Sequence, residues 1–494
     1  MKKKVIITLI LLFNISLFAC TDNTTTTQLT TESWSFSEPQ TNLSFAEIVQ
    51  SLTNPYNIGL FMTEDPEKSM GINFELPEEG SGFVEYRVQG SQQDLSLVVE
   101  TIQKTRLVGK RTVYLHEAVM LNLTPGTTYE YRIRNASSTI VSTAYRFTVP
   151  SENLSEFSFL MMADPQESSE VGYMAYAHVA LNAIAQIEQK PSFVLYVGDI
   201  INDADVRTQW NAFFKYSASF IFDTPIVATA GNHDISGISG TRMSNLEFDG
   251  YMNLPNNGPI YTDFDEIEND ARLSHFDDGK TFSFNYGNVH FVAINTESLC
   301  DGTTTCAYMD ESNVTILKNW LNADLTGNTM KWTIVFLHRG PYSLSYDTAR
   351  VREQLVPIFE THGVDLVLSG HDHQYSRSVY KNTILIPFAR SDNYLKGTIS
   401  LIPEAENNWH FNDYSSSIGV TYLVGNTTGT KYYGGSRNSG IDVQYRFLDA
   451  NPVVPYITVT NDYIKVVSYG MSKASAFQIE VDSVYVLETF YIRK

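Results

Sequence analysis

Five short segments of this chain place side chains that can bind metal ions directly after apolar runs. They read ADPQ at 163–166, GD at 198–199, GNHD at 231–234, LHRG at 337–340 and GHDH at 370–373. Each segment offers a carboxylate, an amide or an imidazole, which are side chains that hold divalent cations in proteins. The runs before them are β-branched or aromatic, which is typical of buried strands. The pattern predicts that ligands from distant parts of the chain gather at strand ends.

Two divalent cations held close together need a carboxylate that bridges them and further oxygen or nitrogen ligands around each, with positions left open for water and substrate. The chain offers six such ligands, which are Asp164, Asp199, Asn232, His338, His371 and His373. No cysteine is among them, which disfavours a structural zinc cage. Taken singly, each residue also fits a turn or a satisfied core histidine. Their occurrence together indicates the site of a two-metal hydrolase.

The order of these segments resembles the calcineurin-like metallophosphoesterases, and among them the purple acid phosphatases. That family carries D-x-(H or G), GD-x-x-Y, GNH-(D or E), a histidine in H-x-x-x-Y, and GH-x-H, where this chain has DPQ, GDIIN, GNHD, HRGPY and GHDH. The resemblance implies an N-terminal all-β sandwich like fibronectin type III. Behind it, the resemblance implies an α/β metallophosphoesterase domain of four layers, with two mixed sheets flanked by helices.

The same resemblance gives each ligand a role. Asp199 would bridge two divalent metal ions, which we expect to be Mn, Zn, Fe or Mg. One metal position would be completed by Asp164, Gln166 and His373. The other would be completed by Asn232, His338 and His371. The two cations would lower the pKa of a shared water, so that a metal-bound hydroxide attacks the phosphorus in line with the leaving group.

The residues beside these ligands are candidates for further roles. By resemblance, His233 faces the leaving-group oxygen as a proton donor, and Asp234 orients its imidazole and favours the charged form. Both residues also fit a cap at the start of a helix after the GN turn. Arg339, next to His338, is either a contact for phosphate or an anchor for its own loop.

Two residues depart from the purple acid phosphatase pattern. Asn202 stands where that family has its metal-binding tyrosine, so we expect no Fe(III)–tyrosinate centre, and Asn202 becomes a candidate for contacting the substrate. Gln166 stands where many relatives have a histidine. Its amide oxygen either ligates a hard cation or only forms hydrogen bonds beside the site. The metal position that contains Gln166 is therefore the altered one.

The first 50 residues predict export. The chain begins MKKKVIITLILLFNISLFAC, a charged start and a short apolar stretch that indicate a signal peptide over residues 1–20. The stretch before Cys20 resembles a lipoprotein signal, which implies a lipid anchor on Cys20 and an extracytoplasmic location at the membrane; ordinary signal cleavage nearby is the alternative. Residues 21–50 are rich in Thr and Ser and predict a flexible tether.

The net charge bears on the partners of the protein, and the cysteines bear on its disulfides. The formal net charge is −21, and so acidic a chain argues against a nucleic-acid partner, which needs basic patches. Cys300 and Cys306 flank a polar DGTTT segment. In an extracytoplasmic protein we expect them to form a small local disulfide, with free thiols as the alternative. The sequence predicts no oligomeric state.

Two patterns of apolar residues divide the rest of the chain. Over residues 51–150, short alternating bursts predict an antiparallel sandwich, in which Tyr129 resembles the tyrosine corner of fibronectin type III domains and His116 is structural. Over residues 151–494, near-continuous apolar runs alternate with helical patterns, which predicts sheets covered on both faces. In such folds ligands collect at the carboxyl ends of the strands. We expect the strand-rich final hundred residues to complete a sheet of this domain, with a separate binding module as the alternative.

These expectations combine into one function. The chain is expected to be an extracytoplasmic two-metal phosphohydrolase that acts on small phosphomonoesters. A phosphodiesterase or nucleotidase of the same fold is the first alternative, because the motifs leave the shape of the substrate site open. A surface lipoprotein that binds without catalysis is the second alternative, although the intact GNHD and GHDH segments argue against it.

Overall fold

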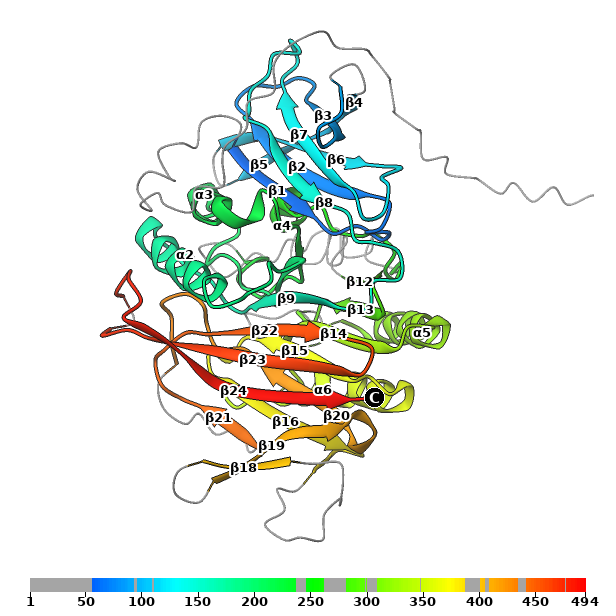
Figure 1. Ribbon diagram of the computed structural model, residues 1–494, viewed down its shortest axis with the longest axis vertical. Helices are drawn as coiled ribbons and strands as arrows, with labels where there is room; N and C mark the ends of the chain where they lie inside the picture. The colour runs from blue at the N-terminus through cyan, green and yellow to red at the C-terminus, as the bar shows by residue number, and fades with distance from the viewer. Residues whose placement is uncertain are drawn as a thin grey trace, which may run out of the picture.

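The computed structural model describes residues 56–92, 96–108, 111–236, 246–261, 281–297, 299, 309–346, 348–386, 400–404, 408–433, 441–475 and 477–494. Within these ranges the chain forms an N-terminal β-sandwich followed by an α/β domain with mixed sheets, which confirms the expected fold class (Figure 1). The signal peptide and tether expected before residue 51, with Cys20, lie outside the described residues, as do Cys300 and Cys306. Among the described helices, none has the length and apolar character needed to cross a membrane.

The sandwich is built from eight antiparallel strands. They are β1 (Tyr56–Phe61), β2 (Met70–Leu76), β3 (Phe83–Val88), β4 (Leu97–Glu100), β5 (Ile102–Val108), β6 (Arg111–Met120), β7 (Thr128–Arg134) and β8 (Tyr145–Thr148). One sheet has the order β1-β2-β6-β5 and the other β4-β3-β7-β8. Apolar side chains alternate along β2, β3 and β7, so the inner faces of the two sheets share one core.

Tyr129 and His116 have the structural roles that the sequence suggested. The Tyr129 hydroxyl accepts a hydrogen bond of 2.9 Å from the backbone N–H of Thr124, five residues upstream, which is the contact of a tyrosine corner. His116 is fully buried, lies 2.8 Å from the Thr101 hydroxyl through Nδ1, and stacks on Phe74. Both residues hold the sandwich together.

The first sheet of the α/β domain is continuous with one sheet of the sandwich. Its parallel centre contains β9 (Phe157–Met162), β10 (Phe193–Tyr196) and β11 (Ile226–Ala228). Beyond β9 lie β22 (Val453–Val459), β23 (Tyr463–Ser472), β24 (Ser483–Arg493), β19 (Asn408–Ser415) and β18 (Ser400–Glu404). On the other side, β11 pairs in parallel with β1 at Phe61 and Ile226, which joins twelve strands in one sheet.

The second sheet has eight strands. They are β12 (Phe282–Tyr286), β13 (Val289–Ile294), β14 (Trp332–Arg339), β15 (Leu366–Gly370), β20 (Val420–Val424), β16 (Tyr375–Lys381) and β17 (Ile384–Leu385), with β21 (Tyr445–Phe447) paired to β16. The run from β13 through β20 is parallel, and antiparallel strands flank it. The C-terminal strand segments therefore divide between the two sheets, because β20 joins this sheet whereas β22, β23 and β24 join the other.

Helices cover both outer faces, which gives four layers. The helices α2 (Glu170–Ile184), α3 (Arg207–Ile221) and α4 (Leu246–Tyr251) pack on the twelve-stranded sheet, and α5 (Glu311–Gly327) and α6 (Ala349–His362) pack on the eight-stranded one (Figure 1). A short 3₁₀ helix, η3 (Ser416–Ile418), precedes β20. Phe159 points into the core between the sheets while the adjacent Leu160 points toward the helices. Strands buried on both faces explain the near-continuous apolar runs.

Candidate metal centre

The predicted ligands follow the ends of parallel strands in both sheets. Asp164 lies two residues after β9, Asp199 three residues after β10, and Asn232 four residues after β11. In the second sheet His338 is the penultimate residue of β14, and His371 directly follows β15. The carboxyl ends of parallel strands meet at one edge of a sheet, so the fold brings these residues together.

Two groups of side chains could each hold a cation. The potential ligand atoms of Asp199, His338 and His371 lie within 4.8 Å of one another, and so do those of Asp164, Asp199 and His373. Every one of these residues is buried. Asp199 belongs to both groups, which is the position that a bridging carboxylate needs.

Hydrogen bonds fix which ring nitrogens face these groups. The Nδ1 of His338 lies 2.8 Å from the backbone carbonyl of Val197, and the Nδ1 of His373 contacts the backbone carbonyl of Lys431. A carbonyl only accepts, so each Nδ1 carries a proton, and in the neutral imidazole each Nε2 has the lone pair. The Nε2 of His338 lies 3.3 Å from Asp199 and 3.3 Å from the Asn232 amide oxygen. The donors therefore converge as ligands of one ion would.

The backbone is strained at the same residues. Asp164, Asp199, His371 and His373 have φ values of 47°, 50°, 69° and 50°, all in the left-handed region that residues other than glycine avoid. Each such residue costs of order ~1–3 kcal/mol, and such strain clusters at functional sites. These side chains are thus held in place against the preference of their own backbone.

Two glycines permit this close approach. A Cβ on Gly198, whose φ is +90°, would lie 2.5 Å from Nδ1 of His338, and a Cβ on Gly370 would lie 2.5 Å from a carboxylate oxygen of Asp164. Neither contact leaves room for a side chain. The glycines of the GD and GHDH segments are therefore required by the ligands packed against them.

Protons balance the two buried carboxylates of the centre when no cation is bound. Burial raises the pKa of Asp164 well above its usual value, whereas for Asp199 the neighbouring His338 and His233 overcome the effect of burial and hold the pKa well below it. Burial opposes protonation of His338, but the Asp199 carboxylate raises its pKa to about 10. Burial lowers the pKa of His373 to about 3, so that imidazole stays neutral and able to ligate. A cation bound here would take the place of the His338 proton.

The residues present fit divalent cations at both positions. One position offers Asp199, Asn232, His338 and His371, and the other offers Asp164, Asp199 and His373. Gln166 is 1% exposed, and its amide oxygen has no hydrogen-bond partner within the described ranges. A buried carbonyl without a partner is costly, and a cation would satisfy it.

Two family profiles match the chain. Residues 157–375 match the calcineurin-like phosphoesterase family, and residues 55–149 match the purple acid phosphatase N-terminal domain. The chain carries a calcineurin-like metallophosphoesterase domain. All the predicted metal ligands lie within the range of that domain.

Individual relatives agree with this assignment. The chain is 25% identical over 377 residues to probable inactive purple acid phosphatase 1 of Arabidopsis thaliana, with 69% of this chain and 57% of that protein covered. It is 23% identical over 305 residues to purple acid phosphatase 23 of the same plant, with 55% of this chain and 59% of that protein covered. The chain thus spans little more than half the length of these curated relatives.

Two solved structures share the fold. Purple acid phosphatase PPD1 from yellow lupin (Lupinus luteus) seeds superposes with a TM-score of 0.58 at 16% identity, covering 89% of this chain and 74% of that one. PhoD superposes with a TM-score of 0.57 at 14% identity, covering 90% of this chain and 91% of that one. The metallophosphoesterase domain and the sandwich before it therefore recur together in known structures.

The proton-donor candidate of the metallophosphoesterase domain has an unexpected partner. His233 Nδ1 lies 2.7 Å from the backbone carbonyl of Asn202. Asp234, expected to orient this imidazole, instead accepts backbone N–H groups from Ile200, Ile201 and Gly231. The expectation for Asp234 was wrong in its partner: its carboxylate is fully buried and ties the GD loop to the GN turn.

Arg339 is both a loop anchor and a neighbour of the centre. Its Nε lies 3.0 Å and 2.8 Å from the two carboxylate oxygens of Glu297, which is fully buried. Its Nη1 lies 2.7 Å from Nε2 of His371. The guanidinium thus places a positive charge beside a predicted ligand, and with burial it lowers the pKa of that histidine well below its usual value.

Sequence reasoning missed the residues that brace the histidines. Tyr346 packs on His371 at 4.5 Å between ring centroids, and Tyr433 stacks on His373 at 4.4 Å. Asp372, the third residue of GHDH, accepts hydrogen bonds from the Ser343 hydroxyl and the backbone N–H groups of Leu344 and Ser345. The only available signal was the placement of Asp372 between two ligands, because nothing in the pattern around either tyrosine marks it.

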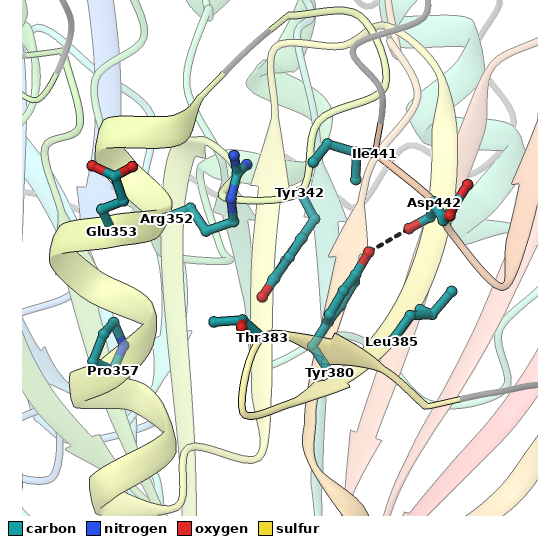
Figure 2. Close-up of a pocket in the computed structure, with 9 residues that line it drawn as sticks. All are labelled: Tyr342, Arg352, Glu353, Pro357, Tyr380, Thr383, Leu385, Ile441 and Asp442. Atoms are coloured by element: carbon teal, nitrogen blue, oxygen red, sulfur yellow. Dashed lines mark hydrogen bonds between the residues drawn. The ribbon is translucent and has the colours of Figure 1, made fainter.

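The tyrosine of the HRGPY segment points elsewhere. Tyr342 stacks on Tyr380 at 3.6 Å between ring centroids, and the Tyr380 hydroxyl donates a hydrogen bond of 2.5 Å to the backbone carbonyl of Asp442 (Figure 2). Both rings line a cavity of about 660 Å³ beside α6, and no residue that lines it belongs to the metal centre. Tyr342 therefore packs the layer behind the site.

Proposed function

We propose that this protein is a metal-dependent phosphoesterase that hydrolyses small phosphomonoesters. The observation that carries the proposal is the position of Asp199, one buried carboxylate shared by two groups of potential ligands. A shared carboxylate suits two cations a few ångströms apart, which is the arrangement that phosphate-ester hydrolysis uses. The family profile over residues 157–375 supports the same reaction class.

Each ligand has a distinct task in this proposal. Two divalent cations, when bound, supply an activated water and neutralise the charge that develops on the phosphoryl oxygens. Asp199 would be a ligand of both cations, because it belongs to both groups. The Nε2 atoms of His338 and His373 ligate because their Nδ1 atoms already donate to backbone carbonyls. The buried setting holds these ligands in place against the preference of their strained backbone.

His233 is the proposed proton donor to the leaving-group oxygen. Its Nδ1 is engaged by the Asn202 carbonyl, which orients the ring and leaves Nε2 for the substrate. Its backbone N–H donates to Asp199 at 2.8 Å, so the backbone of His233 is tied to the shared carboxylate. Protonating the departing alkoxide or phenoxide accelerates hydrolysis by about 10²–10⁴-fold in enzymes that use a positioned acid.

The test pairs metal content with two substrates. Protein loaded with Mn²⁺ is assayed on an aryl monophosphate and on a bis-aryl diester, and we expect faster hydrolysis of the monoester. His233→Ala should keep both metals and lose about 10²–10⁴-fold in kcat. A His233→Ala variant with full turnover would remove the assigned role, and faster diester cleavage would make the protein a phosphodiesterase instead.

We further propose that the enzyme works outside the cytoplasm on a lipid anchor. The support is the sequence of residues 1–20, a charged start and an apolar stretch that end at Cys20. Cys20→Ser should move the protein from the membrane fraction to the soluble fraction of the cell. Equal membrane content of the variant and the parent chain would contradict the anchor.

A further inference from the structure

We propose that Asn202 is a positioning residue that aims the amide oxygen of Gln166 at the metal position of Asp164, Asp199 and His373. The inference rests on the metal centre of the proposed function and assigns the two residues that depart from the purple acid phosphatase pattern to one device. It would explain how a glutamine serves where many relatives have a histidine. Four side chains, linked by directional hydrogen bonds, carry the argument.

The chain of hydrogen bonds starts at Gln209 in α3. Its Oε1 lies 2.9 Å from the backbone N–H of Asn202 and 2.8 Å from that of Asp203. Backbone N–H groups only donate, so this end of the amide must be its oxygen. The Nε2 of Gln209 then faces Asp203 and donates to its carboxylate at 2.9 Å. Gln209 is 4% exposed, so water does not compete for the hydrogen bonds that fix this orientation.

Asp203 fixes the orientation of the Asn202 side-chain amide. Its carboxylate also accepts a hydrogen bond of 2.8 Å from Nδ2 of Asn202. An ionised carboxylate only accepts, so the amino end of Asn202 must face Asp203. The amide oxygen of Asn202 consequently faces the other way, toward Gln166.

The Asn202 amide in turn fixes the orientation of the Gln166 amide. Its Nε2 donates to the Asn202 amide oxygen at 3.3 Å, so its own oxygen lies on the side away from Asn202. That oxygen is buried and has no hydrogen-bond partner among the described residues. The backbone N–H of Gln166 donates at 3.0 Å to the carbonyl of Asp199, which keeps the residue beside the shared ligand. A buried acceptor without a partner, on a residue tied to the backbone of Asp199, is what a hard cation requires.

The reverse orientation would defeat the site. A flipped Gln166 would present its amino group, with two donor hydrogens, to the bound cation and would leave the Asn202 oxygen without its donor. Asn202 therefore protects metal binding without touching metal. An amide oxygen in place of imidazole also favours oxygen-preferring ions such as Mn²⁺ over Zn²⁺ at this position.

The same residue holds the proposed proton donor. The backbone carbonyl of Asn202 accepts from His233, while its side chain orients Gln166. A side-chain substitution at 202 leaves the backbone carbonyl in place. Loss of metal affinity can thus be separated from loss of the contact to His233.

Mn²⁺ titration by calorimetry tests the proposal on the full chain. Asn202→Ala should weaken one of two Mn²⁺ sites by about 10–100-fold, the usual effect of removing a residue that orients a ligand, and leave the other site unchanged. Gln166→Leu should weaken the same site. The decisive step is Asn202→Ala made on top of Gln166→Leu, which should cost no further affinity because Asn202 acts through Gln166.

The controls separate failure of this proposal from failure of the proposed function. Asn202→Asp still offers an acceptor to Gln166 and should bind Mn²⁺ more tightly than Asn202→Ala; it also serves if the alanine variant does not fold. Unchanged Mn²⁺ affinity in Asn202→Ala would overturn the positioning role of Asn202, even in an active enzyme. So would losses of Mn²⁺ affinity that add up in the double variant. A parent chain that binds two Mn²⁺ ions without hydrolysing esters would overturn the proposed function but not the positioning role of Asn202.

Discussion

The N-terminal sandwich and the metal centre both bury charged side chains, but they balance that charge differently. On the sheet formed by β3 and β7, Glu85 accepts from Arg132 and Arg134 at 2.7 Å each, and Glu130 accepts from Arg87 at 2.9 Å. These residues are 2–9% exposed. Each of these two buried acids thus has buried arginine partners from the same sheet, and both carboxylates are compensated within the domain.

The metal centre balances its carboxylates with protons, because Asp199 is paired with the protonated His338 and burial raises the pKa of Asp164. Asp164 and Asp199 are buried with the neutral imidazole of His373 and with His338, whose proton Asp199 retains. Their backbones are strained, whereas Glu85 and Glu130 lie in regular strands. The difference teaches that buried carboxylates paired with arginines, which stay charged, serve the fold, while buried carboxylates at strained residues that are balanced by protons can exchange those protons for a cation.

The largest expected effect comes from breaking the shared carboxylate. Asp199→Asn should lose both metals and at least about 10³-fold of activity, because one residue serves both positions. Its unfolding free energy in a chelator should fall by less than that of Glu85→Ala, because His338 can lose its proton once the Asp199 charge is removed, whereas the guanidinium groups around Glu85 stay charged. Elemental analysis and chemical denaturation measure the two quantities. Retained metals in this variant would refute the bridge.

The sandwich should respond in the opposite way. Glu85→Ala leaves the buried guanidinium groups of Arg132 and Arg134 without their shared carboxylate, which should lower the unfolding free energy by about 3–5 kcal/mol. The metal content of the folded protein should stay at the parent value. If Glu85→Ala instead lost metal while keeping its stability, the division between the two regions would fail.

The smallest expected effect concerns two buried histidines. Burial lowers the pKa of His116 in the sandwich to about 4 from the usual 6.5, whereas Asp199 raises that of His338. The unfolded chain therefore binds a proton on His116 below pH 6.5 that the folded chain refuses until about pH 4. Stability from this residue is fully present above pH 6.5 and is lost as the pH falls toward 4.

His116→Gln isolates that contribution. The stability of the parent chain relative to His116→Gln should decrease by at most about 2 kcal/mol between pH 6.5 and pH 5. Thermal unfolding of both chains at the two pH values measures the difference. A difference that stays constant with pH would mean that His116 is not held neutral by its burial.

Much of this comparison was accessible from the sequence. Alternating apolar bursts predicted the sandwich, and continuous runs predicted sheets covered on both faces, because burial on one or two faces leaves a direct imprint on residue type. Ligands at strand ends could be placed in one centre since carboxyl ends of parallel strands share an edge. The predicted groups around Asp199 are the groups that the fold brings together.

Other features depend on contacts that no local pattern records. The joining of the sandwich to the catalytic sheet rests on one parallel pairing between β1 and β11. Asp234 was assigned to His233 because they are adjacent in sequence, yet successive residues of a turn point in different directions, and Asp234 reaches backbone N–H groups of the neighbouring loop. The chain of hydrogen bonds from Gln209 to Gln166 joins residues 43 positions apart. It depends on amide orientations that only the three-dimensional structure reveals.

Electron paramagnetic resonance of the Mn²⁺-loaded protein, read together with its metal content, tests the central claim most directly. Two cations that share the Asp199 carboxylate must lie close enough to couple magnetically. We predict two Mn²⁺ ions per chain and the signal of a coupled pair, which Asp199→Asn abolishes. A single ion per chain, or two ions whose signals are those of isolated Mn²⁺, would contradict a shared two-metal centre.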